Sequence, residues 1–269
     1  QGFSAVMTKI GILGAAGRMG RMLIRDVLAT SGAELAGGVD TSALGEDLGV
    51  LAGAKPAGLK VTNDAPALFA ASDALIDFTA PAATRAHIEL AAKTGKALVI
   101  GTTGLSEDIV ATIDAAARKA AIVRSANMSL GVNILIAFTE KLAAALGSDA
   151  DIEIVEMHHR HKVDSPSGTA LALGEAAARG RKVALNDVAR MVRQGQVGAR
   201  PAGEIGFATL RGGDVIGDHT VIFASEGERI ELTHKASSRE LFARGAVRAA
   251  LWAAGRAPGL YSMKDVLGL

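Results

Sequence analysis

Short apolar runs alternate with alanine-rich amphipathic segments over residues 9–128. Such runs are typical of buried strands, and apolar positions repeating about every 3.6 residues are typical of helices. Strands that alternate with helices in this way predict a parallel sheet with helices on both faces. The expected strands are Lys9–Leu13, Glu34–Val39, Ala74–Phe78, Ala97–Ile100 and Ile122–Arg124, and the expected helices are Arg18–Ala29, Thr84–Thr94 and Glu107–Lys119.

The pattern changes after a helix expected over Val132–Leu146. The segments that follow are rich in β-branched residues and are separated by turns that contain glycine, which is typical of strands. They are Asp151–Met157, Glu204–Arg211, His219–Ala224 and Arg229–Lys235, with a hairpin connection at 225–228. Capping hydroxyls predict a helix that begins near Ser167, and a last helix is expected over Ser238–Ala254. We therefore predict a second, α+β domain with a mixed sheet.

Composition narrows the classes of protein that the chain can belong to. Of its 269 residues 49% are hydrophobic, which is enough for two domain cores. The net charge of +1 argues against a protein that neutralises many nucleic-acid phosphates, and no apolar run reaches the roughly 20 residues that span a bilayer. The chain has no cysteine, which excludes thiolate chemistry and fits the cytoplasm. Met7 is expected to be the natural start, so residues 1–6 are left out of the fold prediction.

A glycine-rich turn, Gly14-Ala15-Ala16-Gly17-Arg18-Met19-Gly20, joins the first expected strand to the first helix. In that position glycines allow a tight turn, and the helix N-terminus offers N–H groups to a pyrophosphate. Asp40 ends the second strand, where a carboxylate can accept hydrogen bonds from an adenine ribose. An ordinary turn acid is the alternative for Asp40, and we favour a Rossmann-like dinucleotide site. Thr41 and Ser42 follow where an arginine would favour a 2′-phosphate, so NADH is expected to be preferred over NADPH, with Arg18 offsetting part of that preference.

The residues after the other expected strands are small or can form hydrogen bonds. In an open parallel sheet the ligand lies outside the carboxyl ends of the strands, so these residues can face a nicotinamide ring. Ordinary capping of the following helix is the alternative for each segment taken singly. The segments are Phe78-Thr79, Gly101-Thr102-Thr103-Gly104 and Ser125-Ala126-Asn127-Met128.

Three histidines, an arginine and a lysine occupy positions 158–162. A zinc site is not expected, because the i, i+4 histidine spacing is missing and Arg160 and Lys162 would repel a dication. If the preceding strand runs on, alternation places His158, Arg160 and Lys162 on one face. The alternative is a solvated basic turn. Five such residues directly before a capped helix favour a site that binds an anion and protonates it.

The chain resembles the family of 4-hydroxy-tetrahydrodipicolinate reductase, also called dihydrodipicolinate reductase. The resemblance extends from Lys9 to Leu269. It rests on the following motifs: Glu156–Thr169, Gly14–Gly20, Gly101–Gly104, Gly206–Thr209 and Thr233–Ser238. It implies a cytoplasmic homotetramer of the diaminopimelate route to lysine that uses NADH and NADPH to reduce a cyclic dicarboxylate.

Carried over by motif, the resemblance makes His158 the general acid and Lys162 a second proton donor. His159, Gly168 and Thr169 would bind the substrate carboxylates. The dinucleotide would contact Gly14, Ala15, Ala16, Gly17, Arg18, Met19, Asp40, Gly101, Thr102, Thr103, Ser125, Ala126, Asn127 and Met128. Residues 7–128 would form the dinucleotide-binding domain, to which a C-terminal helix at 239–269 returns, and residues 129–238 would form the domain for substrate binding and oligomerisation.

Two other interpretations of the function stay open at this point. One is a different two-domain dehydrogenase that acts on an amino or imino acid, for which the histidine run would be coincidental. The other is a regulatory protein that senses a dinucleotide without turnover, although the chain has no pair of DNA-reading helices and no basic arm.

Overall fold

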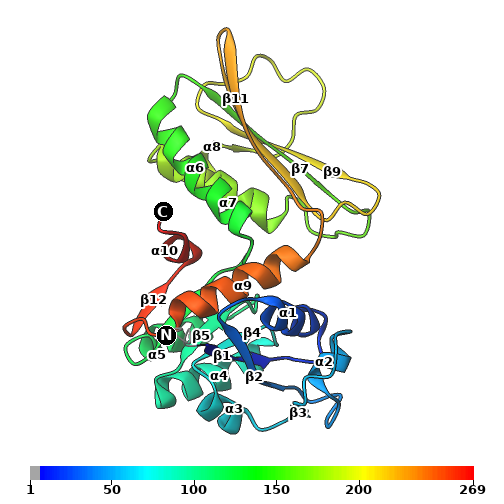
Figure 1. Ribbon diagram of the computed structural model, residues 1–269. Helices are drawn as coiled ribbons and strands as arrows, with labels where there is room; N and C mark the ends of the chain where they lie inside the picture. The colour runs from blue at the N-terminus through cyan, green and yellow to red at the C-terminus, as the bar shows by residue number, and fades with distance from the viewer. Residues whose placement is uncertain (1–6) are drawn as a thin grey trace, which may run out of the picture. The chain divides into compact units, whose positions relative to one another are not determined.

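The computed structural model describes residues 7–269 (Figure 1), and the residues expected to precede the natural start lie outside this part. The chain divides into two compact units. The first consists of residues 7–130 together with Glu240–Gly268, and the second is Gly131–Arg239. Among the described helices, none is both long and apolar enough to cross a membrane.

The sheet of the first unit has seven strands in the order β12-β6-β5-β4-β1-β2-β3, and every pairing in it is parallel. From β1 the chain moves outward to β2 and β3, and then returns to β4 on the other side of β1. That reversal creates a switch point between β1 and β4, which is where ligands of open parallel sheets bind. The strands are β1 Thr8–Leu13, β2 Ala33–Val39, β3 Val61–Thr62, β4 Ala74–Asp77, β5 Ala97–Ile100, β6 Ala121–Arg124 and β12 Gly259–Tyr261.

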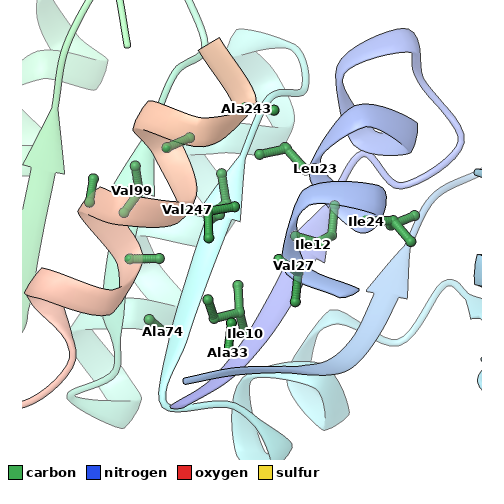
Figure 2. Packing of buried hydrophobic residues seen from close by; sticks show 14 of the residues in the cluster. Ile10, Ile12, Leu23, Ile24, Val27, Ala33, Ala74, Val99, Ala243 and Val247 are labelled. Atoms are coloured by element: carbon green, nitrogen blue, oxygen red, sulfur yellow. The ribbon is translucent and has the colours of Figure 1, made fainter. Parts of the chain in front are cut away.

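Helices cover both faces of this sheet because alternate side chains of each buried strand point to opposite faces. On β4, Ile76 packs into a cluster with α1 (Arg18–Ala29) and α9 (Glu240–Ala253), and Leu75 packs into a second cluster on the other face. Figure 2 shows the first cluster, in which Ile10, Val27 and Val247 are fully or almost fully buried. The helices of the other face are α3 Ala65–Ala71, α4 Pro81–Thr94 and α5 Glu107–Ala116, and α2 is a short turn at Leu48–Leu51. The predicted doubly wound parallel sheet is confirmed.

The C-terminal segment that belongs to the first unit was predicted as one helix over 239–269, and this prediction is wrong. It contains α9, strand β12 and a short helix α10 at Met263–Leu267. Gly255 adopts a left-handed φ of 86°, which ends the preceding helix, and Pro258 has no N–H to continue one. The chain then pairs with β6 and adds an edge strand to the sheet.

The second unit contains a mixed five-stranded sheet in the order β11-β10-β7-β9-β8. β10 pairs antiparallel with β7 and β11, whereas β9 pairs parallel with β7 and β8. On β7, alternation buries Ile152, Ile154, Glu156 and His158, and the two isoleucines form the core together with helix residues. The elements are α6 Leu130–Leu146, β7 Asp151–His158, α7 Gly168–Gly180, α8 Leu185–Val188, β8 Ala189–Arg190, β9 Ile205–Arg211, β10 Asp218–Ser225 and β11 Glu228–Lys235. The predicted second domain with a mixed sheet is confirmed.

Candidate active site

The turn between β1 and α1 requires glycine for steric reasons. Gly14 has a φ of +84°, and a Cβ there would lie 2.7 Å from the carbonyl oxygen of Phe78. A Cβ on Gly20 would lie 2.0 Å from the carbonyl oxygen of Gly14. The helix begins at Arg18 with Gly17 as its N-cap, which has no side chain to occupy the first-turn N–H groups. The turn therefore leaves space and donors for a phosphate at the end of β1.

Asp40 follows β2 and faces this turn. Its Oδ2 accepts a hydrogen bond from the amide of Ala16 at 3.0 Å, and its Oδ1 accepts from the amide and the hydroxyl of Ser42, both at 3.0 Å. Burial alone would raise the pKa of Asp40, but the hydrogen bonds from Ser42 and Ala16 outweigh it and hold the pKa below its ordinary value. Asp40 is thus an ionised acceptor beside the phosphate-binding turn.

A cavity of about 440 Å³ opens at the switch point of the sheet. Of the cofactor residues predicted from the sequence, Gly14, Gly17 and Asp40 line it, and Ala15, Ala16, Arg18 and Met19 belong to the same turn and the start of α1. Its other lining residues are Val39, Thr41, Asn63, Phe78, Thr79, Ala80, Ala83 and His87. The shape and donors of this region fit a dinucleotide, whose pyrophosphate needs a glycine turn and whose ribose needs an acceptor.

A buried carboxylate connects the loops that follow β4 and β5. Asp77 is fully buried, and its Oδ1 accepts hydrogen bonds from the Thr79 amide at 3.0 Å, the Thr79 hydroxyl at 2.6 Å and the Thr102 hydroxyl at 3.1 Å. Its Oδ2 lies 2.8 Å from Nδ1 of His87 on α4. Thr102 therefore lies next to the switch point, and Gly101 and Thr103 are its neighbours in the chain. Asp77 and His87 were not predicted from the sequence, although an acid inside the apolar run 74–78 was a usable signal.

The loop after β6 is closed by its own hydrogen bonds. The Ser125 hydroxyl donates to the Asn127 carbonyl oxygen at 2.7 Å, and the Ser129 amide donates to Oδ1 of Asn127 at 2.9 Å. Ala126 lies inside this loop, and Met128 is buried in the core. The predicted segment 125–128 is therefore a fixed loop at the carboxyl edge of the sheet.

In the second unit, a buried network surrounds His158. Glu156 is 1% exposed, and its Oε2 lies 2.5 Å from Nδ1 of His158. Arg211 donates to both carboxylate oxygens, at 2.8 and 3.0 Å, and the Ser167 amide donates to Oε1 at 3.0 Å. Burial would raise the pKa of Glu156, but Arg211, His158 and Ser167 together hold it below the ordinary value.

The strand does not run through the histidine cluster, contrary to the conditional expectation from alternation. β7 ends at His158, and residues 160 and 161 form a turn, because the amides of His159 and Arg160 bond to the carbonyl oxygens of Val215 and Gly213 instead of continuing the ladder. His158 is buried, whereas Lys162 lies in the loop and pairs with Asp164 at 2.8 Å. The two predicted proton donors thus do not share a strand face.

His159 faces a separate, open hollow. This hollow has a volume of about 630 Å³ and is lined by His159, Arg160, His161, Gly213, Asp214 and Arg239. The pKa of His159 is lowered, chiefly by partial burial of the ring and next by the positive charge of Arg239. Gly168 and Thr169 form the first turn of α7, where a helix concentrates partial positive charge. Ser167 caps this helix by accepting a hydrogen bond from the Ala170 amide at 3.1 Å.

A second buried imidazole packs against His158. The rings of His158 and His219 meet edge to face with centroids 5.0 Å apart, and Nε2 of His219 lies 3.0 Å from the Ser167 hydroxyl. Burial and the neighbouring His158 lower the pKa of His219 to about 4, although Glu156 opposes the shift. His219 is therefore neutral at pH 7.

Glu156, Arg211 and His219 were also not predicted as site residues. Glu156 was detectable, because it continues the inward positions of Ile152 and Ile154 on an expected strand. Arg211 and His219 had no local signal, since β9 and β10 bring them to His158 from distant parts of the chain. Within residues 7–269, no group of three or more histidine or acidic side chains is arranged to hold a metal ion.

Comparison with known proteins identifies the family. The family model described as dihydrodipicolinate reductase, N-terminus, matches residues 8–128, and the model described as dihydrodipicolinate reductase, C-terminus, matches residues 131–267. Proteins named 4-hydroxy-tetrahydrodipicolinate reductase from Parvibaculum lavamentivorans and Dinoroseobacter shibae are 59% and 56% identical to the chain; each match covers 97% of the chain and 98% of the relative.

A solved structure agrees with these matches. The dipicolinate-bound dihydrodipicolinate reductase from Paenisporosarcina sp. TG-14 superimposes with a TM-score of 0.77 at 26% identity, over 96% of this chain and 98% of that one. The two halves of the family model, the relatives and this structure all extend over both units. The chain therefore belongs to the dihydrodipicolinate reductase family.

Proposed function

We propose that the chain catalyses the NAD(P)H-dependent reduction of 4-hydroxy-tetrahydrodipicolinate to tetrahydrodipicolinate in the diaminopimelate route to lysine. The observation that carries the proposal is the match over almost the whole chain to relatives of that name at up to 59% identity. The net reaction balances: a hydride and a proton enter, a C–H bond replaces the C–O bond, and the hydroxyl leaves as water.

The first unit is proposed to bind the dinucleotide and the second to bind the substrate. A bound reduced nicotinamide dinucleotide supplies the hydride. Gly14 to Met19 bind its pyrophosphate, Asp40 accepts from its ribose, and the loops 101–103 and 125–128 orient the nicotinamide end. Support comes from the left-handed Gly14 and from the position of Asp40 at the switch-point cavity.

His158 is proposed as the general acid and Lys162 as a second proton donor. The carboxylate of Glu156 beside Nδ1 orients the ring, so that a proton on Nε2 is the one that can be released. The substrate carries two carboxylates, and His159, Gly168 and Thr169 would bind them. Support comes from the cationic side chains around His159 and from the positive end of α7.

NADH is proposed as the preferred cofactor, with NADPH also accepted. An ionised Asp40 repels a 2′-phosphate, and Thr41 and Ser42 offer no positive charge to offset this repulsion. The pKa of Asp40 lies below its ordinary value, so the repulsion persists through neutral pH.

We further propose that the protein is a cytoplasmic homotetramer assembled through the second unit. β11 is an edge strand of its sheet, and edge strands invite pairing with another chain. Ile230 on β11 and Leu210 on β9 are large apolar side chains that are 41% and 49% exposed. Sedimentation equilibrium checks the assembly, which fails as proposed if the protein sediments as a monomer at micromolar concentration.

Absorbance at the nicotinamide band tests the reaction. NADH is mixed with the protein and with the freshly generated condensation product of pyruvate and aspartate semialdehyde. Loss of NADH that requires both protein and substrate supports the reductase. Tight cofactor binding without turnover, with NADH and with NADPH, would instead favour the dinucleotide sensor, and turnover only with amino or imino acids would favour the other dehydrogenase.

A further inference from the structure

Glu156 is the one carboxylate among the inward-facing positions of β7, where Ile152, Ile154 and His158 are its companions on that face. Burying a carboxylate in an apolar core costs free energy unless hydrogen bonds compensate for the lost hydration. Here four donor groups from three other residues reach its two oxygens, and these residues come from β7, the start of α7 and the end of β9. Glu156 therefore joins three segments of the second unit at one point.

The contact with His158 sets the chemistry of its ring. A carboxylate only accepts hydrogen bonds, so the proton between Oε2 and Nδ1 is carried by Nδ1. In the neutral imidazole Nε2 is then the basic nitrogen, and in the imidazolium Nε2 carries the proton that can leave. Gly217 leaves room at this nitrogen, because a Cβ at that position would lie 2.9 Å from Nε2.

The same carboxylate fixes the start of α7. The Ser167 amide donates to Oε1, and the Ser167 hydroxyl caps the helix whose first residues are Gly168 and Thr169. One side chain thus sets the position of the imidazole and of the positively polarised helix end. A proton donor and a carboxylate-binding turn must keep a constant separation if they act on the same small substrate.

Arg211 keeps Glu156 ionised and reaches further. Its guanidinium donates to both oxygens of Glu156, and its Nη2 also donates to the carbonyl oxygen of Asp164 at 2.7 Å. Asp164 in turn pairs with Lys162, so Arg211 connects Glu156 to the loop that carries the second proposed donor. The groups that face the His158 ring are Glu156 on its own strand, Arg211 opposite it on β9 and His219 on β10.

We propose that Glu156 is the positioning residue of the reaction: it holds His158 with Nε2 toward the substrate and fixes the start of α7 relative to that nitrogen. The proposal rests on the proposed function of the chain. This role differs from that of a purely structural ion pair with Arg211. An ion pair that only stabilises the fold would not affect the pH dependence of turnover.

The test compares Glu156→Gln with Glu153→Gln. Glu153 is a matched control, since it lies on the same strand, faces the other side of the sheet and pairs with Arg193 and Arg200. For Glu156→Gln we expect kcat to fall roughly 10- to 100-fold, the alkaline limb of the kcat profile to move to lower pH by about one unit, and the dissociation constant of NADH to stay within about twofold. For Glu153→Gln we expect a wild-type kcat and profile.

An unchanged kcat profile in a folded Glu156→Gln protein would overturn the proposal. If the wild-type protein is active and only the Glu156→Gln profile is unchanged, the proposed function stands and the role of Glu156 fails. If the wild-type protein itself shows no turnover, the proposed function fails. The two failures are therefore distinguishable.

A second measurement uses neither Glu156→Gln nor activity. In ¹⁵N-histidine NMR spectra of the wild-type protein, the His158 signals are assigned by their loss in His158→Gln. In the neutral ring we expect the proton on Nδ1, with Nε2 unprotonated. A neutral His158 with its proton on Nε2 contradicts the proposal, since Glu156 then cannot accept from Nδ1.

Discussion

Nδ1 of His87 lies 2.8 Å from Oδ2 of Asp77, and both side chains are buried behind the switch point of the parallel sheet. The other oxygen of Asp77 accepts from Thr79 and Thr102, which lie in the loops after β4 and β5. The pair thus connects the loop after β4, which lines the switch-point cavity, to the loop after β5, which is proposed to orient the nicotinamide end.

Replacing Asp77 should loosen both loops. Asp77→Asn removes the charge and leaves buried donors poorly matched, which costs about 1–3 kcal/mol of unfolding free energy. We also expect the dissociation constant of NADH to rise. Urea unfolding followed by the fluorescence of Trp252, the one tryptophan of the chain, measures the first effect, and calorimetric titration measures the second.

The matched control is Asp73→Asn. Asp73 lies directly before the first residue of β4, whereas Asp77 is the last residue of that strand. Asp73 is exposed and accepts a hydrogen bond from the Lys9 amide, so Asp73→Asn should lower the free energy of unfolding by less than about 1 kcal/mol. Wild-type NADH affinity in Asp77→Asn would show that this network does not position the cofactor loops.

Alanine substitutions at two glycines distinguish the effect of backbone strain from the effect of a steric clash. Gly14 and Gly32 both have a φ of +84°, but a Cβ at Gly14 meets the carbonyl oxygen of Phe78, whereas nothing lies within 4 Å of one at Gly32. Gly32→Ala should cost the left-handed strain of about 1–2 kcal/mol and leave NADH binding unchanged. Gly14→Ala should cost about 1–3 kcal/mol more and weaken NADH binding. Equal effects of the two substitutions on affinity would contradict a role for the turn in binding phosphate.

The cofactor preference should respond to position 41. Thr41→Arg adds a positive charge beside Asp40, where a 2′-phosphate would lie, and charge-assisted hydrogen bonds contribute about 1.5–3 kcal/mol. We expect the ratio of kcat/KM for NADPH to kcat/KM for NADH to rise about tenfold. Steady-state kinetics with both cofactors measures it, and a ratio within twofold of wild type would argue against this position as the selector.

His219 makes stability depend on pH in the acid range. Its pKa is about 4 in the folded protein and near 6.5 when exposed, so the unfolded chain binds a proton that the folded chain excludes. The contribution of His219 to the free energy of unfolding is complete above pH 6.5 and is lost as the pH falls toward 4. This contribution amounts to about 3 kcal/mol. His219→Gln should show a shallower fall of unfolding free energy between these pH values, measured by urea unfolding.

His234 and His159 also have lowered pKa values, and acidic groups such as Glu156 contribute at the lower end of this range. The difference between wild type and variant isolates His219 from them. Parallel curves for the two proteins would mean that His219 does not govern this dependence.

His158 should carry the proton transfer. General acids contribute roughly 10²–10⁴-fold, so His158→Gln should lower kcat by that factor. The affinity for NADH should not change, because the cofactor loops belong to the other unit. Stopped-flow turnover and calorimetric titration check the two statements. A variant with wild-type kcat would assign the proton to another group.

The sequence predicted both sheets and the positions of their longer strands, because burial on two faces produces apolar runs and burial on one face produces alternation. It did not predict β3, β8 and β12, strands of two or three residues. The pairing of such short strands, as of β12 with β6, depends on tertiary contact. The glycine turn and the histidine cluster are local in sequence and were found as candidates. Arg211 and His219 could not be found, since register between β7, β9 and β10 brings them to His158.

The most direct measurement follows the hydrogen itself. NADH with deuterium at both C4 positions is incubated with the protein and the freshly generated substrate, and the product is analysed by mass spectrometry. We predict a product one mass unit heavier than the product made with ordinary NADH, formed only when the protein is present. A product without deuterium, or dinucleotide that binds and keeps both deuterium atoms, would contradict it.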